Sequence, residues 1–530
     1  MRQHIPGETS GLATGRQRQN DQVTRRDLFR RVPAVLAPAV VASAVSAPAC
    51  IRAAEQFAEN SSGPVLGIPP ADDDWSATAL KNYQLGMIQH FGGLVRNIPL
   101  ETKAQHLEWV LARYLLAPYN QLHHSVSLPE LPGQPPAFLF GDDVATWQGA
   151  CVAAMSYRLA VTRDPGTREL LCRLLDGLHL MIEATGSRGL IARCLLERDA
   201  PEGKCTVRYQ ADDGRVFYLR SEAAKGTFNQ VAGGLAICLL VAGDQLPEPV
   251  RNQARDDLSQ MAHHLVYHDY RLTEADGKHT EYGNMIPRIG PQSVPFNAQV
   301  AYTVVAAGHT FPSDDPVVAK RVRRGFEELR EKHHVYYEAP VATLIRPQEI
   351  GGSPLLKGMN DRNHVLNAAY VSLMLELVAS RQAGREPDRR FLYEMGQTMV
   401  HTINRIQYER NALCNLMWAA MISDPDAGPA LLPRPGVQTQ QQLRFLVETA
   451  IEQLRRCPVD RFNRPGDKIE TRTPQWVDAQ RPFEVYYWKA GAFNRFEETG
   501  PSTNVLNIAT DFLHAYWLMR YFRIEERITA

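Results

Sequence analysis

The sequence has 530 residues, of which 44% are hydrophobic and 22% charged, a composition typical of soluble globular proteins. A chain of this length can bury a large core without disulfides or metal ions. Lys plus Arg equals Asp plus Glu at 58 each, so the formal net charge is zero. A protein that binds nucleic acid needs a surplus of positive charge, so we expect no nucleic-acid partner.

The first 31 residues form a basic leader in which seven Arg outnumber three acidic residues. The apolar run from Val32 to Ala49 follows, and it is too short and too interrupted by proline for a membrane span. The leader resembles the twin-arginine export motif, read by a receptor on folded proteins, at Thr24-Arg25-Arg26-Asp27-Leu28-Phe29-Arg30. We therefore expect the twin-arginine export machinery as a partner, a periplasmic or extracellular location, and no transmembrane span in the mature chain.

The end of the leader predicts the domain boundaries. Ala47-Pro48-Ala49 is typical of a signal-peptidase site, so residues 1–50 are expected to be a signal segment. Lipid attachment at Cys50 is the alternative, although Ala47 stands where lipoprotein signals usually have Leu. Residues 51–74 are then a linker, and residues 75–530 form the folded domain.

The cysteine pattern gives no support for a zinc ribbon or a thioredoxin-like site, because the eight cysteines include no CxxC pair. An oxidising compartment permits disulfides, although a chain that folds before export first meets a reducing cytosol. Cys194 and Cys205 flank a short irregular stretch, so they are the pair we expect to form a bridge.

Helical periodicity dominates the rest of the chain. Apolar spacing and turn signals predict helices over 76–95, 101–117, 143–162, 165–186, 226–243, 248–268, 296–309, 316–334, 361–380, 387–407, 410–422, 438–455 and about 505–525. Short β-like runs occur near 190–196 and 215–219.

The helices alternate in character, which predicts the architecture. A helix rich in small apolar residues is followed by a turn and then by a longer amphipathic helix. The first kind must be buried and the second must cover it. Six such hairpins closed into a ring would make an all-α fold, an (α/α)6 toroid with minor β-like loops. An open helical solenoid is the alternative, but solenoid repeats keep a tighter period.

Several segments carry a family resemblance. The chain resembles six-hairpin glycosidases and toroid lyases at Gly141-Asp142-Asp143-Val144-Ala145-Thr146-Trp147-Gln148-Gly149, at Thr162-Arg163-Asp164-Pro165 and at Gly186-Ser187-Arg188-Gly189-Leu190-Ile191-Ala192-Arg193. It is similar to exported bacterial toroid proteins of unassigned reaction at Asn360-Asp361-Arg362-Asn363-His364, at Glu409-Arg410-Asn411 and over residues 511–521. The resemblance spans about residues 75–525 and implies a toroid fold. It departs at Lys225-Gly226-Thr227, where such sequences often have Asp, so no catalytic role is carried over there.

In a toroid, the loops that enter the inner helices meet at one mouth, where the helix N-termini favour anionic or hydroxyl-rich ligands. Asp142 and Asp143 lie on the first such loop, where a carboxylate is suited to acid or base catalysis and Trp147 to stacking on a sugar. The structural alternative is that one Asp caps the helix that begins near residue 143.

Three other entry loops complete the predicted site. His364 ends a polar loop and is a candidate for proton transfer near neutral pH. Tyr282 is a candidate acid or base, with an aromatic contact as the alternative, and Glu409 is a candidate carboxylate. We assign catalysis to Asp143, Tyr282, His364 and Glu409, and ligand binding to Asp142, Trp147, Arg193, Asn360, Asn363 and Arg410.

The sequence predicts no metal and no cofactor. His263-His264 and the other histidine doublets diverge on a helix, and His264 with His268 lacks the Glu of an HExxH zinc site. No Walker loop, GxGxxG fingerprint or GxSxG elbow occurs. The resemblance to six-hairpin glycosidases and lyases implies an exported carbohydrate-active enzyme, which would hydrolyse glycosidic bonds through two carboxylates or eliminate them through His and Tyr. The alternative is a noncatalytic envelope or glycan-binding toroid.

Overall fold

In the computed structural model, the chain divides into two compact units, Met1–Gln56 and Phe57–Ala530. The structure describes residues of the second unit only, namely 70–197 apart from 72, then 203, 205, 207–289, 292–332, 359–406, 411–432, 437–463 and 503–529. The predicted signal segment 1–50 and most of the predicted linker 51–74 lie outside the described residues. None of the helices within the described ranges is both long enough and apolar enough to cross a membrane.

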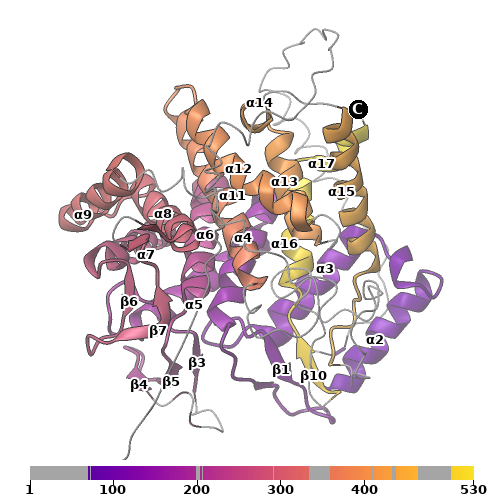
Figure 1. The fold of residues 1–530 in the computed structure, drawn as a ribbon. Coiled ribbons are helices and arrows are strands. Elements are labelled where there is room, and N and C mark those ends of the chain that lie inside the picture. Colours follow the sequence, from indigo (N-terminus) through magenta and orange to yellow (C-terminus); the bar gives the residue numbers. More distant parts are fainter. Residues whose placement is uncertain are drawn as a thin grey trace, which may run out of the picture. The chain divides into compact units, whose positions relative to one another are not determined.

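The second unit is predominantly helical, as predicted from the sequence (Figure 1). Its α-helices are α2 (Ala77–His90), α3 (Leu100–Val110), α4 (Val144–Thr162), α5 (Pro165–Glu183), α6 (Lys225–Val241), α7 (Glu248–Tyr267), α8 (Pro295–Thr310), α9 (Pro316–Glu327), α11 (Met359–Gln382), α12 (Arg389–Ile406), α13 (Ala412–Ile422), α14 (Ala427–Leu431), α15 (Val437–Arg456), α16 (Thr510–Tyr521) and α17 (Ile524–Thr529). Short 3-10 or π-helical turns are η2 (Val95–Asn97), η3 (Leu111–Leu115), η4 (Gly243–Gln245) and η5 (Glu328–Lys332).

Small antiparallel sheets occupy the connections between helices. Their strands are β1 (Ser125–Ser127), β2 (Ala137–Phe138), β3 (Cys194–Leu196), β4 (Val207–Gln210), β5 (Val216–Arg220), β6 (Arg271–Thr273), β7 (His279–Asn284), β8 (Arg288–Ile289), β9 (Gln292–Ser293) and β10 (Val505–Asn507). They pair in the orders β10-β1-β2, β3-β5-β4, β6-β7 and β8-β9. The β3-β5-β4 sheet leads into α6, and the β6-β7 and β8-β9 hairpins lead into α8.

Six helices, α4, α6, α8, α11, α13 and α16, form the buried centre of this unit. In α4, every side chain from Val144 to Tyr157 is buried, and in α16 every side chain from Thr510 to Met519 is buried. Each of the six helices contacts the next along the chain, and α16 contacts α4, so the order of contacts is cyclic. Helix α11 also contacts α6, so side chains fill part of the space that the cycle surrounds.

Helices α4 and α6 run in the same direction at very close range. Thr146 Oγ1 donates to Thr227 Oγ1 at 2.9 Å near both N-termini. One to two turns further along, a Cβ added to Gly234 would lie 2.1 Å from the carbonyl oxygen of Gly149. Only glycine permits this approach of the two backbones.

The same direction extends to the other buried helices. Near the N-termini of α6 and α11, Gly226 lies against His364, and further along Gly233 lies against Val371. Between α8 and α11, Phe296 lies near His364, and later Thr303 Oγ1 contacts Ser372 Oγ at 2.8 Å. Between α4 and α16, Cys151 lies beside Thr510, and later Tyr157 stacks on His514. The N-termini of α4, α6, α8 and α11 therefore lie at one end, and α16 runs in the same direction but begins beside Cys151, about two turns into α4.

Amphipathic helices connect the buried ones and return the chain to that end. Helix α5 packs on α4 and α7, and α7 packs on α8. Asp164 caps α5 by accepting from Thr167 N at 3.0 Å, with Pro165 in the first turn, as the sequence predicts. Asp315 and Pro316 begin α9 in the same way.

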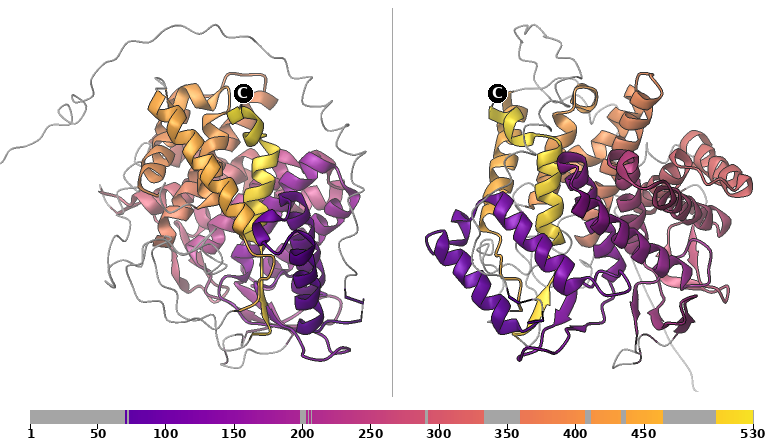
Figure 2. Two further views of the ribbon diagram at one scale, coloured as in Figure 1. Left: turned by 90° about the vertical axis from the view of Figure 1, so that its right-hand side faces the viewer. Right: turned by 180° about the vertical axis from the view of Figure 1, so that it is seen from behind.

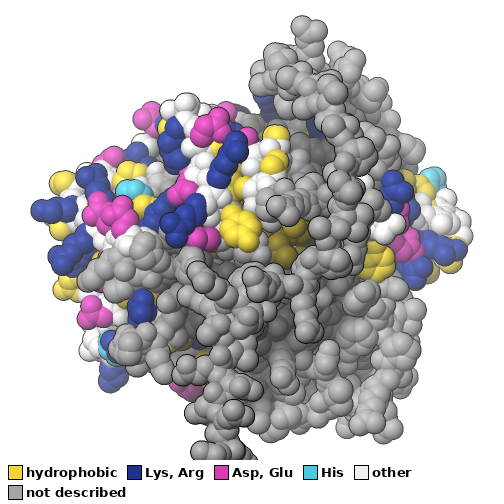
Figure 3. Space-filling view, turned by 45° about the horizontal axis from the view of Figure 1, so that its top comes forward, with side chains coloured by type: hydrophobic (Ala, Val, Ile, Leu, Met, Phe, Trp, Pro, Cys, Tyr) yellow, Lys and Arg dark blue, Asp and Glu magenta, His cyan; other side chains and the backbone are white. Residues whose placement is uncertain are grey.

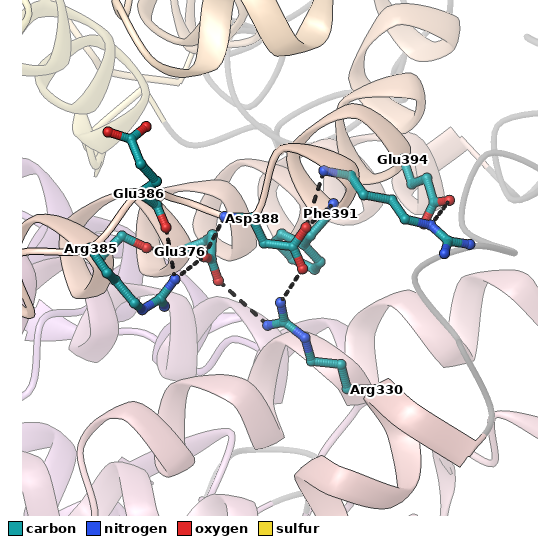
Figure 4. A network of polar contacts seen from close by, with 9 residues as sticks. Arg330, Glu376, Arg385, Glu386, Asp388, Phe391 and Glu394 are labelled. Carbon is teal, nitrogen blue, oxygen red and sulfur yellow. Dashed lines mark hydrogen bonds and ion pairs between the residues drawn. The ribbon is translucent and has the colours of Figure 1, made fainter.

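A polar network fastens α12 to α11 (Figure 4). The buried Glu376 carboxylate accepts from Arg385 Nη1 at 2.9 Å and from Asp388 N at 3.0 Å, and it pairs with Arg330 at 3.4 Å. Asp388 in turn caps α12 through Phe391 N. Burial raises the pKa of Glu376, but hydrogen bonds from Asp388 and Arg385 outweigh it and lower the pKa below its usual value. On the face shown in Figure 3, Lys and Arg are interspersed with Asp and Glu over the described surface.

Residues 505–508, near the C-terminus, pair with residues 124–127. Strand β10 pairs with β1 in the register Val126–Leu506, and Ile508 N donates to His124 O at 2.9 Å. Helix α16 follows directly and packs between α4 and α13, beside α3 (Figure 2). Arg461 Nη2 contacts both oxygens of Asp511 at 2.9 Å, with side chains 2% and 0% exposed. Residues 505–507, predicted as part of the last helix, are therefore a strand, because they pair with β1.

Candidate functional site

The first candidate group is Asp143, which occupies the N-cap position of α4. Its side chain makes no capping hydrogen bond to the helix, although Asp is among the best capping residues. The carboxylate lies 3.5 Å from Arg193 Nη2, and the side chain is 27% exposed. The structural alternative, in which this Asp serves to cap the helix, therefore does not describe Asp143.

Arg193 holds the loop that carries both aspartates. Its Nε donates to Asp142 O at 2.6 Å, and its side chain is only 10% exposed. Its backbone carbonyl accepts from Ala145 N, and its backbone N–H donates to Arg220 O, so Arg193 joins the start of α4 to the end of β5. Arg220 Nε also lies 3.3 Å from Asp142 Oδ1. Two carboxylates and two guanidinium groups thus meet at the N-terminus of α4.

Tyr282 lies on the β6-β7 hairpin. Its side chain is 53% exposed. The pKa of Tyr282 is raised, first by a hydrogen bond with Glu281, and the charges of Asp142 and Arg193 also act on it in opposite directions. The hairpin is anchored before α6, since Thr280 Oγ1 donates to Ala223 O at 2.8 Å. The structure therefore brings Asp142, Asp143 and Arg193 together, and Tyr282 lies near enough for two of their charges to act on its pKa.

His364 lies at the same end but is buried. Helix α11 begins at Met359, so the predicted polar loop is helical and His364 lies in its second turn. The ring is 5% exposed and packs on Gly226, where a Cβ would lie 2.4 Å from Nε2. Burial, together with the positive charge of the neighbouring Lys225, lowers the pKa of His364 to about 3. The sequence-based expectation that His364 titrates near neutral pH is therefore wrong.

Lys225 stands at the position where the resemblance departs from its pattern. Its ammonium group lies 4.6 Å above the Phe296 ring and 3.3 Å from Asn297 Oδ1, so it joins the N-termini of α6 and α8. The sequence singled out this position only for lacking Asp. A cation on the first turn of a predicted inner helix was the available signal, because it opposes the helix dipole.

The other predicted residues are placed less favourably or not described. Trp147 is 1% exposed in the core, so its ring offers no face for stacking on a sugar. Asn360 and Asn363 lie in the first turns of α11, and their side chains are outside the described part of the structure. Glu409 and Arg410 also lie outside it. Arg220 was missed, because only the pairing of β3 with β5 brings it to Asp142.

Backbone contacts hold the ring of His264, one of the two histidines of the i, i+4 pair. His264 Nδ1 donates to Arg188 O at 3.0 Å, while Nε2 accepts from Thr273 N at 3.0 Å. Both ring nitrogens of His264 are thus engaged in hydrogen bonds, which leaves neither for a metal ion shared with His268. Among the side chains that the structure describes, no group of three His, Cys, Asp or Glu could hold a metal ion.

Comparison with known proteins adds nothing to this geometry, since no family model, curated protein or solved structure matches the chain. The resemblance to six-hairpin proteins therefore stays a prediction. What the site can do chemically has to be argued from its own residues.

Proposed function

We propose that residues 75–530 form an (α/α)6 toroid and that the protein is an exported carbohydrate-active enzyme, which cleaves glycosidic bonds in a poly- or oligosaccharide. The cyclic order of contacts among α4, α6, α8, α11, α13 and α16 supports the toroid. Five of these helices run in the same direction. This supports a single mouth, because the helix N-termini and the small sheets that lead into α6 and α8 would then lie at the same end. Fold analogy alone would not carry a function.

The observation that carries the proposed function is the Asp143 carboxylate. It lies at the N-terminus of a buried helix without capping it, partly exposed, and Arg193 fixes its position. A carboxylate held in this way can act on a bound ligand, and a helix N-terminus favours ligands with negative charge or many hydroxyl groups. Asp142 and Tyr282 are exposed enough to contact a ligand.

Hydrolysis by two carboxylates fits this site better than elimination by His and Tyr. Glycoside hydrolysis needs one carboxyl group on each side of the scissile bond. In this proposal Asp143 is one of them, and the other is Glu409, which the sequence suggests and which lies outside the described residues. Elimination would need His364 at the ligand, but this ring is buried against Gly226.

Turnover of a polysaccharide panel tests the proposal. The purified protein is incubated with neutral and uronic polysaccharides, and both new reducing ends and the ultraviolet absorbance of unsaturated products are followed. Asp143→Asn should lower turnover by roughly 100-fold or more, the range for loss of an acid–base group. Asp213→Asn is the matched control, because Asp213 also pairs with an arginine, Arg215, but lies in the exposed β4-β5 turn. It should leave turnover unchanged.

The outcomes separate the candidate functions. New reducing ends without ultraviolet absorbance support hydrolysis, while absorbance supports elimination. Saturable binding without turnover would favour the noncatalytic glycan-binding toroid. Equal activity of Asp143→Asn and Asp213→Asn would remove the catalytic role of Asp143.

Export is proposed through the twin-arginine pathway and is tested separately. Replacing Arg25 and Arg26 together with Lys should abolish export, because a forked guanidinium is not replaced by a compact ammonium group. Cell fractionation measures the result. Normal amounts of the double variant in the periplasm would leave only a general secretory leader.

A further inference from the structure

Cys194 and Cys205 form a buried pair beside the candidate site. Both side chains are 0% exposed. They belong to a small apolar cluster with Val144 and Leu196, and this cluster is separate from the main hydrophobic core. By contrast, Cys151, Cys238, Cys414 and Cys457 belong to the main core, and Cys172 packs against it.

The two thiols are in contact with each other. A hydrogen bond joins the side chains of Cys194 and Cys205, and Gln121 Nε2 lies 3.8 Å from Cys194 Sγ. Burial raises the pKa of the Cys194 thiol, and Cys205 raises it further. The bridge expected from the sequence is not formed in the structure, where both cysteines carry thiol groups.

We propose that Cys194 and Cys205 are a modification site at which a disulfide forms. The oxidant is a second disulfide, supplied by a small molecule or a thiol–disulfide oxidoreductase. One thiolate of the pair attacks it to give a mixed disulfide and release one thiol. The other cysteine then displaces the second thiol, so the pair loses two protons and two electrons and the oxidant becomes two thiols.

Both thiols are buried, so an oxidant reaches the pair only when the structure opens locally. Exposed residues lie on the side of Cys205, whose described neighbours are Gly203 and Val207, with the Val207 side chain 49% exposed. Cys194 has no comparable route, because it begins β3, whose three residues are all buried.

The bond would act on the loop that carries the candidate site. Cys194 directly follows Arg193, which holds Asp142 and Asp143. Linking Cys194 to Cys205 would tie the β3 edge of the sheet to the segment that enters β4. The proposal concerns thiol chemistry only and does not depend on the proposed carbohydrate activity.

Peptide mapping of the full-length protein tests the proposal. The folded protein is incubated with oxidised glutathione, denatured in N-ethylmaleimide to block free thiols, and digested with trypsin without reductant. The sequence places trypsin sites so that Cys194-Leu195-Leu196-Glu197-Arg198 and Cys205-Thr206-Val207-Arg208 are separate peptides. The expected result is one mass equal to both peptides minus two hydrogens, which reductant splits.

Two variants sharpen the result. Cys205→Ser should abolish the linked mass and leave Cys194 alkylated, while Cys414→Ser, which removes a thiol of the main core, should still give it. Because the wild-type assay stands without either variant, misfolding of a variant does not affect it. Absence of the linked mass, glutathione adducts without a link, or a link from either cysteine to a different partner overturns the proposal.

Discussion

Replacing His264 by Gln should reduce the loss of stability that accompanies a fall in pH. His264 is 1% exposed and bonded at both ring nitrogens, to the Arg188 carbonyl and to the Thr273 N–H. A carbonyl only accepts and an N–H only donates, so the ring is held neutral with its proton on Nδ1. Protonation would place a second N–H against the Thr273 N–H.

The magnitude follows from the pKa. Burial lowers the pKa of His264 to about 4, against about 6.5 in the unfolded chain. Between these values the unfolded state binds the proton and the folded state does not. The stabilisation is therefore fully present above pH 6.5 and is lost as the pH falls toward 4. Between pH 7 and pH 5, this one residue should lower the free energy of unfolding by about 2 kcal/mol.

Urea unfolding at pH 7 and pH 5 measures the effect. The loss between the two pH values should be about 2 kcal/mol smaller in His264→Gln than in the parent. A constant loss of packing cancels in this comparison. His90→Gln is the matched control, because His90 lies exposed at the end of α2, and it should follow the parent. The reasoning fails if His264→Gln loses as much stability as the parent between pH 7 and pH 5.

Two further predictions concern packing and buried charge. Gly149→Ala should lower the free energy of unfolding in urea by about 1–3 kcal/mol, because the added Cβ would lie 2.8 Å from Val231 Cα. The control Gly86→Ala on α2 has open space around the added Cβ and should stabilise the protein by up to about 1 kcal/mol. Equal effects of the two variants would contradict the close packing of α4 and α6. Arg461→Met should lower the free energy of unfolding by about 3–5 kcal/mol, because the Asp511 carboxylate would stay buried without its cation. Adding Asp511→Asn to this variant should recover part of the loss. An Arg461→Met variant as stable as the parent would contradict the prediction.

Helix positions could be predicted closely because the sequence marks their ends. Asp164-Pro165 predicts the first turn of α5, which begins at Pro165. The small-residue stretch 226–243 predicts α6, which runs from Lys225 to Val241. The last helix was predicted to begin too early, because no local signal reveals that Leu506 pairs with Val126, about 380 residues away in the chain.

The candidate site could be predicted in part, for a related reason. Asp142 and Asp143 adjoin the start of α4, so their position follows from the helix prediction. His364 and Trp147 depend on which face of a helix meets a neighbour, and a helix that is apolar all round gives no preferred face. Both turn out to be buried, and the sequence alone could not distinguish this from a position at the mouth.

The burial of α4 and α16 also bears on the choice between a ring and an open array. In a solenoid each repeat contacts only its neighbours, and the terminal repeats turn one face to solvent. Helices α4 and α16 lie near opposite ends of the helical order, yet they contact each other and both are buried. The β1-β10 pairing and the Arg461–Asp511 pair reinforce the same junction. If the ring is correct, weakening this junction with Arg461→Met should destabilise the whole helical unit in one transition, whereas an open array would lose only its terminal hairpin.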